Sequence, residues 1–159
     1  MENDARERPA SLRRLPPATR EGRVFWLSHH HPEEYNRTYV LGGIRVCARC
    51  LGTYPVLLAV LVGLFKLRAP LTWSWDVPVV LGLTLPALVD WAVGRFRPTG
   101  GSNAVRTLTG VLLGAALGRS LFIHLQRPLP AVLLWQAALV AGVAIPVLLA
   151  TSRKSNPGP

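Results

Sequence analysis

The chain has 159 residues, enough for one domain, and half of its residues are hydrophobic while only 16% are charged. A formal net charge of +10 would suit a nucleic-acid-binding protein, but long apolar runs beyond residue 50 favour a membrane protein instead. We therefore expect the lipid bilayer as a partner and no nucleic acid.

The first 23 residues carry six arginines and four acidic residues and contain no apolar stretch. Such a segment is unlike a cleaved signal peptide, and it has little apolar surface to bury. We expect disordered tails at residues 1–23 and 151–159.

Residues 24–50, which we name the knuckle, contain three of the four histidines and both cysteines. The stretch YVLGGIRV predicts a tight β-hairpin, because a two-residue turn at residues 42–43 would pair Tyr39 with Val46. The cysteines follow directly as a C-x-x-C pair, so two soft-metal ligands lie at the end of the predicted hairpin.

His29, His31, Cys47 and Cys50 form the pattern H-x-H-x15-C-x2-C. In an extended strand His29 and His31 point the same way, and two imidazoles with two thiolates suit tetrahedral Zn²⁺, with iron as a second possibility. The alternatives are a solvated histidine loop beside cysteines that only pack, and a redox pair, which would normally accompany a larger sheet. Apart from zinc, we expect no cofactor.

Four apolar segments predict an all-α integral membrane protein with a four-helix transmembrane bundle, at about residues 51–67, 77–94, 107–125 and 129–150. The third segment carries Gly110, Gly114 and Gly118 at four-residue spacing, which places them along one stripe of a helix. We expect this stripe to pack closely against another helix, either in this chain or across a homo-oligomer.

Charge predicts the orientation. Four spans put both termini on one side, which would hold fourteen basic residues, whereas the opposite side would hold three. By the positive-inside rule we expect a multi-pass protein of the bacterial inner membrane with both termini in the cytoplasm.

Asp90 is the one acidic residue inside a predicted span, and it lies about one helical turn from the cytoplasmic end. Asn103 and Arg106 open the third span at the same level, so a polar site at the cytoplasmic membrane face can be built from these three residues and the knuckle. Asp90 and Arg106 are the candidate catalytic residues; alternatively, Asp90 only pins helices by an ion pair with Arg106 or Arg95. Arg119, in the outer half, is expected to snorkel or to bind a backbone carbonyl.

Three elements, VCARCLGTY, LPALVDW and SNAVRTLTGVLLG, resemble a family of bacterial predicted membrane proteins that carries a domain-of-unknown-function label. The family pattern joins a Cys-His-Gln stretch near a Pro-Glu to C-A-R-C-T-G-x-Y, P-x-x-x-D-G and N-x-L-R-x-x-T-G elements. The chain departs from it at Leu51 and Trp91, and histidines stand in place of the Cys-His pair, with His29 matching the family histidine. The resemblance implies an architecture and a residue set, without an activity; the matching positions are Cys47, Cys50, Gly52, Tyr54, Asp90, Asn103, Arg106 and Gly110.

These features support a zinc site with a structural, partner-binding or lipid-binding role. The alternative is a metal-dependent membrane enzyme acting on an anionic lipid-like substrate, in which Asp90 is the general base and Arg106 binds the headgroup. A transporter is a third possibility, although its polar path would have only Thr84, Asp90, Arg119 and Gln136 to use.

Overall fold

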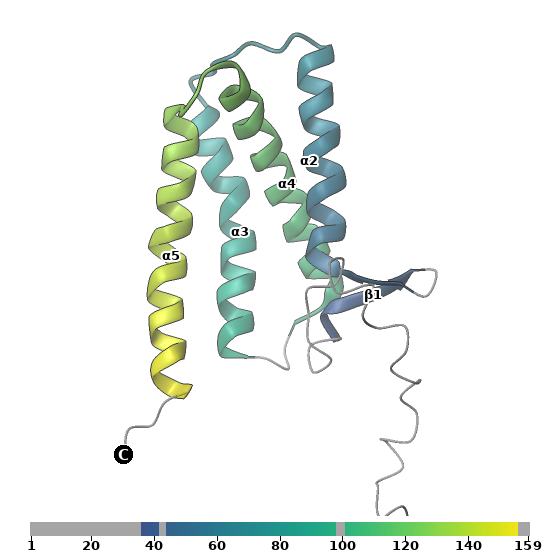
Figure 1. Ribbon diagram of the computed structural model, residues 1–159, viewed down its shortest axis with the longest axis vertical. Helices are drawn as coiled ribbons and strands as arrows, with labels where there is room; N and C mark the ends of the chain where they lie inside the picture. The colour runs from purple at the N-terminus through teal and green to yellow at the C-terminus, as the bar shows by residue number, and fades with distance from the viewer. Residues whose placement is uncertain (1–35, 42–43, 98–100, 156–159) are drawn as a thin grey trace, which may run out of the picture.

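A computed structural model describes residues 36–41, 44–97 and 101–155. The predicted tails, together with His29 and His31, lie outside the described residues or, for residues 151–155, at the end of the last helix. With the labels of Figure 1, the elements are β1 Thr38–Leu41, β2 Ile44–Cys47, α2 Ala48–Lys66, α3 Asp76–Phe96, α4 Asn103–Gln126 and α5 Ala131–Ser155.

All four helices are long and apolar enough to cross a membrane, so the predicted all-α fold class with four spans and a small hairpin is confirmed. Successive helices run in opposite directions, and α2 begins at the same end at which α5 finishes (Figure 1). We call the end that carries the hairpin the hairpin rim and the opposite end the far rim.

The helices form a row rather than a closed bundle, in the order α2, α4, α3, α5 (Figure 1). The most extensive contact is between α2 and α4; α3 packs on α4 and α5 packs mainly on α3. Half of the central stretch of α4 is buried, against 11% for α5. The outer faces of the row therefore present large apolar side chains, which is the arrangement expected of helices surrounded by lipid.

The helices start and end slightly differently from the predicted spans. The first helix starts three residues earlier, so Cys50 lies in the first turn of α2 rather than in the knuckle. The second begins at Asp76, which brings a second acidic residue into a span, and Asp90 is therefore not the only one. Both shifts arise because polar side chains at a helix end find partners on neighbouring elements, which hydropathy alone does not register.

Glycines explain why α2 and α4 approach so closely. A methyl group added at Gly110 would collide with the Arg49 carbonyl oxygen, and one at Gly114 would collide with that of Thr53. Gly118 faces Val60 in the same way. The predicted stripe thus packs against a helix of its own chain, which leaves these glycines no open surface for a second copy.

Apolar packing is concentrated toward the far rim. Its buried members come from the far halves of the last three helices, namely Val80, Ala116, Phe122, Ile123 and Val132. In mid-row a buried chain of hydrogen bonds joins α4, α5 and α3: Ser120 donates to Gln136 Oε1 at 2.7 Å, and Gln136 Nε2 donates to Thr84 Oγ1 at 2.9 Å. Two residues of the possible transport path are thus partners in an interhelical tie.

The hairpin has the predicted register, since Tyr39 pairs with Val46 in the antiparallel ladder. Thr38 lies opposite Cys47 at its base, and β2 passes into α2 without an intervening residue. This direct junction fixes the hairpin, and the cysteines with it, at the end of the first span.

Candidate functional site

Polar residues from the hairpin and three helices converge at the hairpin rim. The Asn103 side-chain amide donates to the Thr38 carbonyl at 3.3 Å, which ties α4 to β1. Arg37 donates to the Gly94 carbonyl of α3 at 3.2 Å, and Thr107 of α4 donates to the carbonyl of Ala48 at 3.0 Å. Segments far apart in the sequence therefore meet at one level, as the sequence predicted for Asp90, Asn103, Arg106 and the cysteines.

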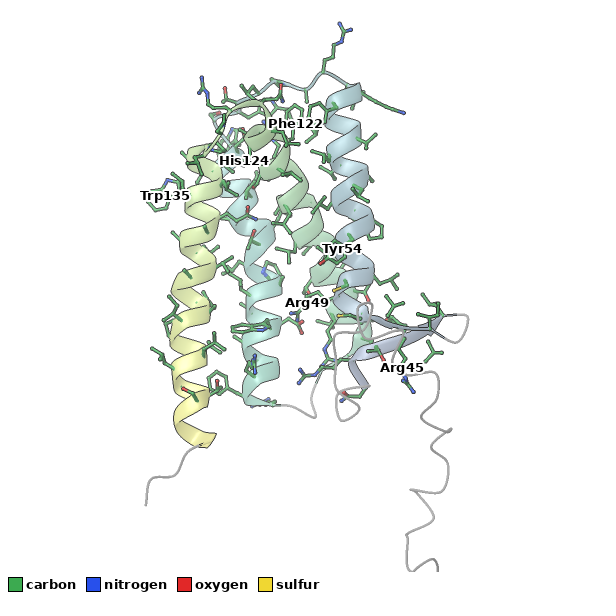
Figure 2. The ribbon with its side chains drawn as sticks, viewed as in Figure 1. Arg45, Arg49, Tyr54, Phe122, His124 and Trp135 are labelled. Atoms are coloured by element: carbon green, nitrogen blue, oxygen red, sulfur yellow. The ribbon has the colours of Figure 1, made fainter. Side chains whose placement is uncertain are left out.

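Asp90 forms an ion pair with Arg49, whose guanidinium reaches it from the first turn of α2. The sequence suggested Arg95 or Arg106 as the partner of Asp90, and the structure adds Arg49. Arg95 lies over the ring of Trp91, while Arg106 is within electrostatic range of Asp90. In Figure 2, Arg49 lies between α2 and α3, two helices that contact each other little elsewhere. The pair bridges the row at the hairpin rim because the sequence places an arginine between the two cysteines.

Arg106 is buried and donates to Asn103 Oδ1 at 3.1 Å, one turn earlier on α4. Asp90, Arg49 and Arg37 all lie within electrostatic range of its guanidinium, as does Cys47. Arg106 on α4 thus lies near two other cationic groups, Arg37 just before β1 and Arg49 on α2, and near the Asp90 carboxylate.

Arg49 offers an open donor in this cluster. Its side chain is partly exposed, at 24%, and its Nε atom is buried with no hydrogen-bond partner among the described residues. A buried N–H in that state can bind a further acceptor, such as a water molecule or an anionic group.

Cys47 is buried and Cys50 is half-buried, neither is in a disulfide, and the two thiols interact with each other. Cys47 ends β2 and precedes the first residue of α2, and Cys50 lies three residues further on in the first turn of that helix, so the two thiols meet where the hairpin joins α2. Two adjacent thiols are half of a tetrahedral zinc site.

The described residues contain no group of three or more His, Cys, Asp or Glu side chains that could hold a metal ion. The predicted ligands His29 and His31 lie outside them, so the donor set consists here of two thiols only. Arg106 lies within electrostatic range of both Cys47 and Asp90, while Gly110, Gly114 and Gly118 serve the α2–α4 contact.

The far rim carries the second acid and a second arginine. Arg119 donates from Nε to Asp76 Oδ1 at 2.8 Å and from Nη2 to Oδ2 at 2.9 Å, a two-pronged ion pair. It also donates to the carbonyls of Pro70 and Leu71, and its guanidinium lies over the Trp73 ring. The expected contact with a carbonyl is present, but the main partner is the carboxylate.

Sequence reasoning missed three residues: Arg49, Asp76 and Arg37. Arg49 could have been found, because it lies between the two cysteines of the C-A-R-C element, within one helical turn of both. Asp76 directly precedes the predicted second span, and an acid at a helix start beside an arginine in a facing span is a recognisable pairing signal.

Comparison with known proteins places this site in a family context. A family model described as "Predicted membrane protein (DUF2085)" matches residues 29–120, more than half of the chain. No curated protein and no solved structure matches. The matched segment includes both histidines, both cysteines, Asp90, Asn103 and Arg106, and it ends within α4.

Proposed function

The chain belongs to the DUF2085 family of predicted membrane proteins, and on that premise we propose that it is a zinc-binding protein of the bacterial inner membrane. Zn²⁺ is bound by His29, His31, Cys47 and Cys50 and fastens the N-terminal segment to α2. The role is structural: the metal holds the arginine-rich hairpin rim in place for an anionic lipid headgroup or a partner protein.

The observation that carries this proposal is the pair of interacting thiols, neither of them in a disulfide, at the junction of β2 and α2. Cysteines in the cytoplasm are kept reduced, so an adjacent pair there is suited to a metal rather than to a structural disulfide.

The histidines are within reach of these thiols. Thr38 lies opposite Cys47, and His31 precedes Thr38 by seven residues, which can span at most about 25 Å when extended. The hairpin brings Thr38 next to Cys47, so only the residues between His31 and Thr38 separate the histidines from the cysteines along this route.

The orientation follows from charge and from the alternation of the helices. Among the described residues the hairpin rim gathers Arg37, Arg45, Arg49, Arg95, Arg97 and Arg106, whereas the far rim has Lys66, Arg68, Arg119 and Arg127, of which Arg119 is neutralised by Asp76. The positive-inside rule puts the hairpin rim, and with it both termini, in the cytoplasm.

The test is the metal content of protein purified in detergent without chelators, measured by mass spectrometry. A closed tetrahedral site predicts about one zinc per chain, and it predicts that Cys47→Ser, Cys50→Ser, His29→Ala and His31→Ala each lose it. His30→Ala and His124→Ala are matched controls that should keep the metal. Metal-free wild-type protein, or equal zinc in every variant, would reject the proposal.

The second candidate is a metal-dependent enzyme acting on an anionic lipid-like substrate. The electrostatic contact of Arg106 with both Asp90 and Cys47 favours it, because an acid and a cation near the metal could serve as base and headgroup ligand. A catalytic zinc keeps an open coordination position. Retention of zinc in either His29→Ala or His31→Ala, with loss on removal of the other histidine, would favour this candidate.

A further inference from the structure

One face of the β1–β2 hairpin is entirely apolar. Side chains alternate along a strand, and the register places Tyr39, Leu41, Ile44 and Val46 on the same face. Leu41 and Ile44 are 51% and 42% exposed, and the other two are half-buried. No member of this face is buried, so a continuous apolar surface is left partly uncovered by the described part of the chain.

The position of this surface is set by the chain connection. Because β2 leads directly into α2, the hairpin lies at the end of the first span. Helix α2 has 19 residues, which at 1.5 Å per residue gives about 28 Å, close to the thickness of the hydrocarbon core. The hairpin therefore lies at the level of the lipid headgroups.

The hairpin extends sideways from the base of α2, away from the other helices (Figure 1). Helix α2 exposes large side chains as well, with Tyr54 at 62% and Leu58 at 58%. The apolar face of the hairpin thus adjoins a candidate membrane span whose own exposed side chains are suited to lipid.

The opposite face of the hairpin carries Arg45 beside its cross-strand partner Val40, which is 59% exposed, and Figure 2 shows the Arg45 side chain directed away from the helices. The apolar face therefore points toward the bilayer side. An apolar face toward acyl chains and an arginine toward phosphates and water is the arrangement of an interfacial anchor. Open strand edges restrict it to the interface, where headgroups and water can bind the free backbone groups.

We propose that the β1–β2 hairpin is a membrane anchor: the face formed by Tyr39, Leu41, Ile44 and Val46 inserts into the leaflet beside α2. Insertion holds the hairpin, and the first turn of α2 that follows it, at a fixed depth. This anchor requires no metal and does not depend on the proposed zinc site.

The test is photo-crosslinking of the full chain in liposomes of bacterial lipids. A benzophenone amino acid replaces Ile44 in one variant and Arg45 in another, two adjacent positions on opposite faces. A third variant carries it at Leu58 as a positive control on the lipid-facing surface of α2. Mass spectrometry then separates lipid adducts from protein adducts.

We expect lipid adducts at Ile44 at a level comparable with Leu58 and several-fold above Arg45. Equal lipid adducts at Ile44 and Arg45, or no adduct at Ile44 while Leu58 reacts, would overturn the proposal. Chain-to-chain adducts as the main product at Ile44 would also overturn it, because they would identify a second copy as the cover. The same substitution at Leu41 repeats the measurement on the same face if the Ile44 variant fails to fold.

Discussion

The two rims of the helix row use the same pair of residue types in different ways. At the far rim, Arg119 makes four hydrogen bonds to Asp76 and to loop carbonyls, and its side chain is 10% exposed. At the hairpin rim, Arg49 pairs with Asp90 through Nη2 and keeps a buried Nε without a hydrogen-bond partner among the described residues. A saturated pair only stabilises, whereas an unsaturated pair beside two thiols can still bind a ligand.

The surroundings differ in the same sense. Close to the far rim lie the apolar core and the rings of Trp73 and Phe122, which flank the Arg119 guanidinium. At the hairpin rim, Asp90 pairs with Arg49, and Arg106 has Arg37, Arg49 and Asp90 as charged neighbours. The far-rim pair therefore has its polar groups satisfied within the chain, whereas the hairpin-rim pair keeps a donor that can bind a ligand.

The largest expected effect is at the far rim. Asp76→Asn leaves the buried Arg119 guanidinium without its counter-charge, and breaking a buried pair from one side costs about 3–5 kcal/mol. We expect that loss in the free energy of unfolding, measured by steric trapping in bicelles. Unchanged stability would show that Arg119 is solvated and that the far-rim pair does not hold α3 and α4 together. Simultaneous Asp76→Asn and Arg119→Leu should recover part of the loss, because no buried charge remains.

A smaller effect is expected where α4 supports the hairpin rim. In Gly110→Ala the new methyl group meets the Arg49 carbonyl and pushes the first turn of α2 away. Overpacking of this kind costs about 1–3 kcal/mol. We expect a fall in the free energy of unfolding, together with weaker zinc retention under a chelator, because Arg49 lies between the two cysteines.

Gly142→Ala in α5 is the matched control for that substitution. A methyl group there meets nothing within the described part of the chain. Stability should stay constant or rise by a few tenths of a kcal/mol, as for Gly→Ala in an open helix position. Equal destabilisation by the two substitutions would contradict the close α2–α4 contact.

The smallest effect on stability is expected for Asp90→Asn. The pair with Arg49 is partly exposed, and exposed ion pairs contribute at most about 1 kcal/mol. The same measurement in bicelles should therefore give a loss well below that of Asp76→Asn. If Asp90→Asn proved as costly as Asp76→Asn, the contrast between the rims would disappear.

The fold was largely predictable from hydropathy. Four apolar runs and a Gly-Gly turn between alternating strands are local signals, and the helices and the Tyr39–Val46 pairing followed from them. The order of the helices in the row was not predictable, because apolar faces of similar character can pack in several ways. The glycine stripe indicated a close contact, yet only the three-dimensional arrangement identifies α2 as its partner.

The depth of the candidate site in the membrane was predictable from the sequence, and the ion-pair partners of its residues were less so. The membrane brings polar residues near span ends to one depth, which placed Asp90, Asn103 and Arg106 together. Depth does not specify lateral neighbours, so the sequence could not choose between Arg49, Arg95 and Arg106 for Asp90. Asp76 was missed because the predicted span was drawn from apolar residues and therefore began after this acid. The sequence alone does not show that Arg119 on α4 neutralises it.

The central claim is that the hairpin rim is a metal site, and zinc-edge X-ray absorption of the purified protein tests it most directly. The account predicts two sulfur ligands at about 2.3 Å and two nitrogen ligands at about 2.0–2.1 Å. A spectrum without sulfur ligands, or protein that contains no zinc, would contradict it.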